Sequence, residues 1–305
     1  MYNTFIQEVG EKMAQSNRYV IFTDATVDLP REDIERYEIQ MLPMAYRLGG
    51  QESFYDGSWD EARVCAFYER LRGGEMATTS QIAPGTYEEF FTPWLEKGMD
   101  ILYVSFSSGL SGTYQSATVA SQMLMERFPD RKVIAVDSLG ATFGEGLAVL
   151  HAAQNREQGI SIEENAEQVR GRVLRNVHWF TVDDLMFLKR GGRISAATAI
   201  LGTTLQIKPV MHVDDEGHLI PVEKAQGRRA SLKALARKMR DTGVDLEKQT
   251  VYIGHGDARA DAEFLADTIR KTMTVGGIHI GTISPIIGAH SGPGTIALFF
   301  IGSHR

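Results

Sequence analysis

Residues 107–114 read Ser-Ser-Gly-Leu-Ser-Gly-Thr-Tyr and connect an apolar run, Ile101 to Phe106, to a segment of helical character, residues 114–127. A turn that leads from a strand into a helix leaves backbone N–H groups unpaired at the positive end of the helix dipole. Serine and threonine hydroxyls add donors at the same point. The stretch therefore predicts an anion-binding turn. A plain helix cap, whose small residues let strand and helix pack closely, is the alternative.

Composition narrows the class of protein. A chain of 305 residues with 43% hydrophobic and 23% charged residues is expected to form a globular protein of two domains. The formal net charge of −7 argues against general nucleic-acid binding. Cys65 is the single cysteine, which excludes an internal disulfide and favours a reducing compartment. No apolar run approaches the roughly 20 residues of a membrane span, so we expect a cytoplasmic protein without integral membrane contact.

Strand and helix signals alternate through residues 1–171, which predicts an N-terminal, Rossmann-like α/β domain with a parallel sheet. Residues 172–305 have a different pattern of strand and helix signals and are expected to form a mixed α/β domain that completes a ligand cleft. Residues 1–18 are a polar extension without an assigned role. The expected strands of the first domain cover residues 19–23, 101–106 and 132–136, with residues 40–48 extended.

Helix signals have identifiable starts and stops. Capping boxes predict helices over residues 58–72, with Ser58 and Glu61, and over residues 161–177, with Ser161 and Glu164. Further helices are expected at residues 86–96, broken at Pro93, and at residues 143–157, 195–206 and 228–240. The runs 209–213 and 219–224 are expected to pair as a hairpin.

A second hydroxyl-rich segment, Thr78-Thr79-Ser80-Gln81, precedes the first. Turns that follow neighbouring parallel strands lie at one sheet edge, where ligands usually bind. The two segments could therefore converge on one carboxylate or phosphate. Considered alone, Thr79 and Ser80 are more often ordinary turn residues.

One histidine stands in a glycine-rich segment, Gly288-Ala289-His290-Ser291-Gly292-Pro293-Gly294. The composition predicts a tight loop that exposes the imidazole edge, either as a structural loop or as a hydrogen-bond donor or proton carrier. No second histidine or cysteine stands at the spacing of a zinc site, so we expect no metal. A Walker-type nucleotide loop is absent, and Asp24 and Asp28 after the first strand are expected to cap the following helix.

Basic residues concentrate in the second half of the chain. Residues 228–240 form a basic segment that suits a solvated helix face. Arg193 stands on the glycine turn Gly191-Gly192-Arg193, where its charge is not explained as part of a solvated helix face. A cation in this position suits contact with a phosphate or an acidic partner.

Taken in order, these segments resemble the DegV family of bacterial fatty-acid-binding proteins. Each motif alone is modest, but their joint order is specific and extends over almost the whole chain from Tyr19. Three departures, Ala25, Ile82 and the pair Leu139-Gly140, leave the donors intact and bear on the shape of the pocket. The matching segments are residues 23–30, 79–81, 107–117, 136–138, 180–195, 207–209 and 287–294.

The resemblance implies a two-domain protein that holds one long-chain fatty acid and has neither a cofactor nor a catalytic residue of its own. It further implies an ATP-dependent fatty-acid kinase partner that phosphorylates the bound carboxylate to an acyl phosphate for phospholipid synthesis. Arg193 and Arg228 would face this partner or the acyl phosphate. The implied carboxylate-binding residues are Thr79, Ser80, Ser108, Ser111, Gly112 and His290.

Two other interpretations remain open at this stage. The chain could be an enzyme that acts on a small phosphorylated or carboxylate substrate with His290 as acid or base. It could also be a regulatory module in which lipid occupancy changes docking through the basic helix at residues 228–240.

Overall fold

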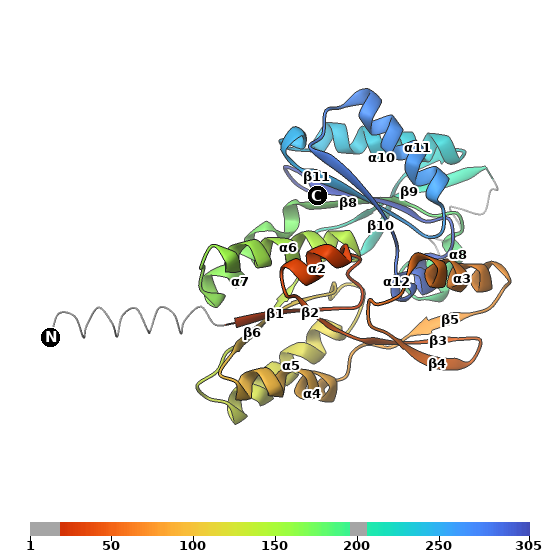
Figure 1. Cartoon of the computed structure of the whole chain (residues 1–305). Coiled ribbons are helices and arrows are strands. Elements are labelled where there is room, and N and C mark those ends of the chain that lie inside the picture. The colour runs from red at the N-terminus through yellow and green to blue at the C-terminus, as the bar shows by residue number, and fades with distance from the viewer. Residues whose placement is uncertain (1–18, 196–205) are drawn as a thin grey trace.

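The computed structural model describes residues 19–195 and 206–305. The extension 1–18 and most of the helix expected at residues 195–206 lie outside these ranges. The chain forms an α/β fold of two domains with three sheets (Figure 1). In the described ranges, no helix combines the length and the apolar character that a membrane crossing requires.

The N-terminal domain contains a parallel sheet of order β2-β1-β6-β7, as the alternation of signals predicted. Successive side chains of β1 point to opposite faces, so that Ile21 packs under α6 and α7 while Phe22 packs against α4 and α5. Helices thus cover both faces of the sheet (Figure 1). The strands are β1 (Tyr19–Asp24), β2 (Gln40–Leu42), β6 (Asp100–Ser105) and β7 (Val133–Asp137); the helices are α2 (Arg31–Arg36), α4 (Pro84–Glu96), α5 (Thr113–Arg127), α6 (Phe143–Glu157) and α7 (Ile162–Arg172).

A small antiparallel sheet of order β4-β3-β5 extends from this domain. Its strand β5 contains Thr78 and Thr79 of the second hydroxyl-rich segment, and pairing with β3 fixes Thr79 opposite Tyr46. The helix that follows β4 packs on this sheet. The elements are β3 (Met44–Leu48), β4 (Gln51–Tyr55), α3 (Glu61–Arg72) and β5 (Ala77–Thr79).

The C-terminal domain is built on a six-stranded mixed sheet of order β10-β9-β8-β13-β11-β12. Helices α10 and α11 cover one face, and the predicted hairpin is confirmed as the antiparallel pair β9 and β10. The elements are β8 (Asn176–Thr181), α8 (Leu185–Arg190), β9 (Ile207–Val213), β10 (Leu219–Gln226), α10 (Arg228–Thr242), β11 (Thr250–His255), α11 (Arg259–Thr272), β12 (Gly277–Thr282), α12 (Pro285–Ser291) and β13 (Ile296–Ile301), with short 3-10 turns at 173–175 and 246–248.

The two domains share one apolar core. Phe143, the first residue of α6, stacks on Tyr252 of β11 with ring centroids 5.2 Å apart and also approaches Phe299 of β13. The face of the six-stranded sheet that α10 and α11 leave uncovered therefore packs on the N-terminal domain. The carboxyl ends of the parallel strands β1, β6 and β7 lie beneath this face.

Several local expectations were wrong. Helix α3 begins after Asp60, whose carboxylate accepts the amide of Arg63, while the Ser58 hydroxyl donates to Asp56. Helix α4 continues through Pro93 to Glu96, although this proline lacks the amide that would donate to the carbonyl of Glu89.

Two further corrections concern the elements near the domain interface. Ser161 caps α7 as predicted, but the helix ends at Arg172, since the residues from Asn176 join the six-stranded sheet. The segment expected as a loop around His290 is mostly the helix α12, which begins at Pro285 and ends before Gly292.

Asp24 caps no helix. Its carboxylate accepts the amide and hydroxyl of Thr26, the amide of Phe106 and the hydroxyl of Tyr103. The same Thr26 hydroxyl lies 2.5 Å from Glu145 of α6. One hydroxyl proton cannot serve two carboxylates, so one carboxyl must itself carry a proton.

Glu145 is the protonated member of this pair. Burial raises its pKa well above the usual range, with the Asp24 charge as the next cause. Burial also raises the pKa of Asp24, but two backbone amides and a phenol stabilise that carboxylate, whereas hydroxyls are the hydrogen-bond partners of Glu145.

We predict a pH dependence of stability from this proton. The native state keeps it while the unfolded chain loses it, so the free energy of unfolding should fall by up to about 1.4 kcal/mol per unit as pH rises above about 5. Glu145→Gln keeps an acceptor and a donor and should lack this part of the slope in urea denaturation at about pH 5–8. Asp24→Asn, the matched variant, should lose about 2–3 kcal/mol at every pH because amide donors then face one another. Equal slopes in the wild type and Glu145→Gln would contradict the assignment.

Candidate functional site

A cavity of about 830 Å³, counting its open mouth, lies between the N-terminal domain and the six-stranded sheet. Most of its wall is apolar and comes from both domains. One end carries polar side chains from β5, from the turn after β6 and from α12. Apolar lining residues include Phe106, Leu110, Phe180, Leu188, Val213 and Ile286.

Thr79 and His290 form the centre of the polar end. The Thr79 hydroxyl oxygen lies 2.7 Å from Nε2 of His290, and both residues line the cavity. Strand β5 holds Thr79 through its pairing with β3, while α12 packs on β5 and carries His290. The structure thus brings together two segments that lie more than 200 residues apart in the sequence.

His290 is neutral at physiological pH. Burial lowers its pKa to about 4, and the nearby charge of Arg193 contributes in the same direction. Its Nδ1 is buried and has no hydrogen-bond partner in the described chain. This nitrogen faces Gly191, where any β-carbon would collide with the ring. The imidazole therefore brings no charge to this end of the cavity, with Nε2 engaged by Thr79 and Nδ1 unpaired beside Gly191.

The turn at residues 107–112 contributes through a side chain. Its amides at Leu110 and Ser111 donate to the Ser107 carbonyl, and that of Ser108 donates to Asp137. The Ser111 hydroxyl lines the cavity, 2.9 Å from the Thr113 hydroxyl. The turn thus presents a hydroxyl, while these three amides are already bonded within the protein.

The remaining predicted head-group residues lie around this centre. Ser80 is exposed and lines the cavity, which therefore opens to the surface at its polar end. Ser108 and Gly112 lie outside the lining. Gly112 caps α5 and leaves room for the Gln81 side chain, which bonds Ser116.

Arg193 lies at the polar end of the cavity. Its guanidinium donates to the carbonyls of Leu110, at 3.1 Å, and Gly191. Burial lowers its pKa, and within the described residues it forms no ion pair with a carboxylate. A half-buried cation without a counter-ion beside a cavity favours an anionic ligand.

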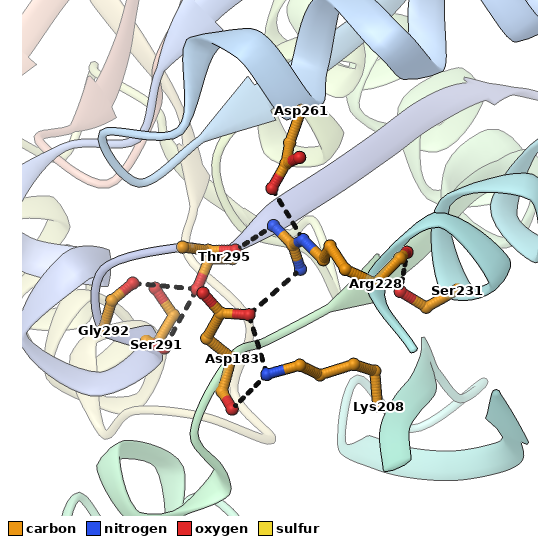
Figure 2. A network of polar contacts seen from close by, with 9 residues as sticks. Asp183, Lys208, Arg228, Ser231, Asp261, Ser291, Gly292 and Thr295 are labelled. Carbon is orange, nitrogen blue, oxygen red and sulfur yellow. Dashed lines mark hydrogen bonds and ion pairs between the residues drawn. The ribbon is translucent and has the colours of Figure 1, made fainter. Parts of the chain in front are cut away.

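Arg228 has a different environment (Figure 2). Its Nε lies 2.7 Å from Asp261, its Nη1 lies 3.7 Å from Asp183, and a third contact reaches the carbonyl of Gly294. Lys208 also bonds Asp183, at 3.0 Å. Arg228 is therefore compensated inside the C-terminal domain and does not line the cavity.

Sequence reasoning missed the wall that the C-terminal sheet contributes. Phe180 of β8, Val213 of β9 and Phe299 of β13 reach the cavity from neighbouring strands. Alternation along each strand could have shown that two faces exist, but not which one meets the other domain. No cluster of histidine, cysteine, aspartate and glutamate suited to a metal ion occurs in the described ranges.

Comparisons with known proteins agree with this architecture. A family model described as "Uncharacterised protein, DegV family" matches residues 18–303. A DegV domain-containing protein of Clostridium perfringens is 41% identical over 288 residues, which cover 94% of this chain and 99% of the relative.

Solved structures are similar over nearly the whole chain. A DegV lipid-binding protein from Thermotoga maritima has a TM-score of 0.80 at 28% identity and covers 94% of this chain and 99% of its own. A Thermus thermophilus protein, described by its fatty-acid binding, has the same TM-score and identity and covers 93% and 99%. A fatty-acid-binding DegV from Bacillus subtilis has a TM-score of 0.78 at 25% identity and covers 94% and 99%. The chain therefore belongs to the DegV family.

Proposed function

We propose that this protein binds one long-chain fatty acid, with the alkyl tail in the apolar cavity and the carboxylate at Thr79, Ser111 and His290. The observation that carries the proposal is a long apolar wall that ends in hydroxyls and a neutral imidazole. Fatty-acid binding by solved DegV relatives supports it. At about 0.8 kcal/mol per buried methylene, the tail supplies most of the affinity.

We further propose that the protein presents this carboxylate to an ATP-dependent partner kinase, for acyl-phosphate formation that feeds phospholipid synthesis in the cytoplasm. Neutral donors hold a carboxylate without neutralising it, so its oxygen stays able to attack a phosphoryl group. The opening beside Ser80 gives a partner access to the head group. In this proposal Ser80, Ser108 and Gly112 shape the head-group region, and Arg193 faces the partner or the transferred phosphate.

An acid role for His290 in an enzyme has less support. Burial lowers the pKa of His290 to about 4, so the protonated imidazolium is scarcely populated near neutral pH. His290 therefore has no readily available proton to donate as a general acid. The protein is proposed to be a carrier without catalysis of its own.

Denaturing extraction followed by mass spectrometry tests lipid binding. We expect about one fatty acid per chain from the purified protein. Val213→Trp fills the cavity and should abolish this yield, whereas Val222→Trp on exposed β10 should leave it unchanged. Absence of lipid from repeated wild-type preparations would sink the proposal.

Ser111→Ala should separate head-group contact from tail binding. Loss of one hydrogen bond to a charged group, about 1.5–3 kcal/mol, should slow acyl-phosphate formation with the partner kinase by about tenfold or more. Fatty-acid dissociation should change less, because the tail dominates affinity. Ser53→Ala on exposed β4 is the control. Equal changes in dissociation and phosphorylation would contradict the separation.

Arg193→Gln should keep the bound fatty acid and lower the rate of phosphorylation by about tenfold or more, since it removes a cation beside the head group. Arg237→Gln, on an exposed arginine paired with Glu223, is the matched control and should have no effect. Arg228→Gln should instead lower the melting temperature, because it leaves Asp261 without its counter-ion and Asp183 with Lys208 alone. An unchanged rate for Arg193→Gln would remove this role.

A further inference from the structure

Two unpaired polar side chains interrupt the apolar wall of the cavity away from the head-group residues. Thr142 and His178 line the cavity and are 3% and 2% exposed. The Thr142 hydroxyl and both ring nitrogens of His178 have no hydrogen-bond partner in the described part of the chain. A buried donor or acceptor left unpaired costs about 1–3 kcal/mol, so this arrangement needs a physical reason.

Thr142 stands at the start of α6, in the turn after β7. Its backbone has φ of 53°, which a β-branched residue rarely adopts, and its amide donates to the carbonyl of Thr26. A valine would fill the same volume without a buried hydroxyl. The residue is therefore not explained by packing alone.

His178 lies on the face of β8 that packs against α6. Its ring contacts Gly140 and Gly144, where a β-carbon would collide with it, and lies 5.5 Å from the ring of Phe299. Burial lowers its pKa well below the usual range, so the ring is neutral. It thus holds one N–H donor and one nitrogen acceptor in a fixed orientation.

This pair comes from other elements than the side chains of the carboxylate site. The head-group side chains come from β5, the turn after β6 and α12, whereas Thr142 follows β7 and His178 lies on β8. Strands β6 and β7 are neighbours, and the amide of Ser107 donates to the carbonyl of Gly140, so the turn that carries Thr142 lies beside the turn at residues 107–112.

We propose that Thr142 and His178 form a second polar subsite that binds an uncharged oxygen on the acyl chain, a hydroxyl or oxo group. The inference rests on the proposed fatty-acid binding and adds the substrate class: long-chain fatty acids oxidised within the chain. A hydroxyl can donate to one nitrogen of His178 and accept from Thr142. The nearby Arg305 guanidinium donates to the carbonyls of Asn176, Val173 and Asp214 and does not line the cavity, so a second carboxylate is not favoured.

Competition binding with positional isomers tests this subsite. Octadecanoic acid and its monohydroxy isomers, each with the hydroxyl on a different carbon, compete with a fluorescent fatty acid for the delipidated protein. We expect a narrow set of adjacent isomers to bind at least as tightly as the parent acid, and the other isomers to bind more weakly. Thr142→Val, which is isosteric, should lower the affinity of the preferred isomers relative to the parent by about tenfold.

Thr181→Val is the matched control, because the Thr181 hydroxyl is also buried and unpaired but does not line the cavity. Thr181→Val should leave unchanged the ratio between the affinity for the preferred hydroxy acids and the affinity for the parent acid. If every isomer binds more weakly than the parent, or if Thr142→Val leaves the ratio unchanged, the subsite is overturned while fatty-acid binding stands. If octadecanoic acid itself fails to displace the probe, the proposed function fails instead. Preference for the α,ω-dicarboxylic acid over the hydroxy isomers would also overturn the assignment of an uncharged group.

Discussion

The Asp24 carboxylate is the constraint on which the ligand-binding edge depends. It accepts hydrogen bonds from the turn after β1, from Tyr103 in β6 and from Phe106, at the point where the chain enters the turn at residues 107–112. Through Thr26 it also fixes Glu145 on α6. A single buried charge thereby sets the relative positions of three chain segments beneath the cavity, and one shared proton makes the arrangement possible.

The buried polar groups fall into two kinds, and the difference has functional meaning. Asp24 accepts hydrogen bonds from four donors and Arg228 pairs with two carboxylates, so both charges are compensated within the protein. Arg193 and His290 keep unsatisfied charge or hydrogen-bonding capacity beside the cavity. Because an unpaired polar group is costly in a low-dielectric interior, such capacity is a sign of what a ligand supplies. The same reasoning separates Arg193 from Arg228, to which the family resemblance assigned the same role.

The strand, turn and helix at residues 101–127 could be predicted because their signals are local: an apolar run, small hydroxyl residues and helical periodicity. The helix at His290 could not, because glycines at residues 288, 292 and 294 suggest a loop. Gly288 instead gives room to the ring of Tyr68, and Gly292 ends the helix with φ of 76°. The apolar wall depends on which face of the six-stranded sheet meets the other domain. Which face is buried depends on how the two domains pack, and no single segment of the sequence determines it.

The turn at residues 107–112 illustrates how packing changes the chemistry of a motif. From sequence, the free amides of a helix start make it a general anion site. In the structure the amides of Ser108, Leu110 and Ser111, in the turn before the helix, are bonded internally, and the Ser111 residue lines the cavity with its hydroxyl beside Thr113. The Ser111 hydroxyl and the neutral His290 bring no charge of their own, and Arg193 supplies positive charge at this end of the cavity; a singly charged carboxylate needs less compensation there than a phosphate. The arrangement therefore fits the proposed fatty acid, whose tail would contribute more to binding than its head group.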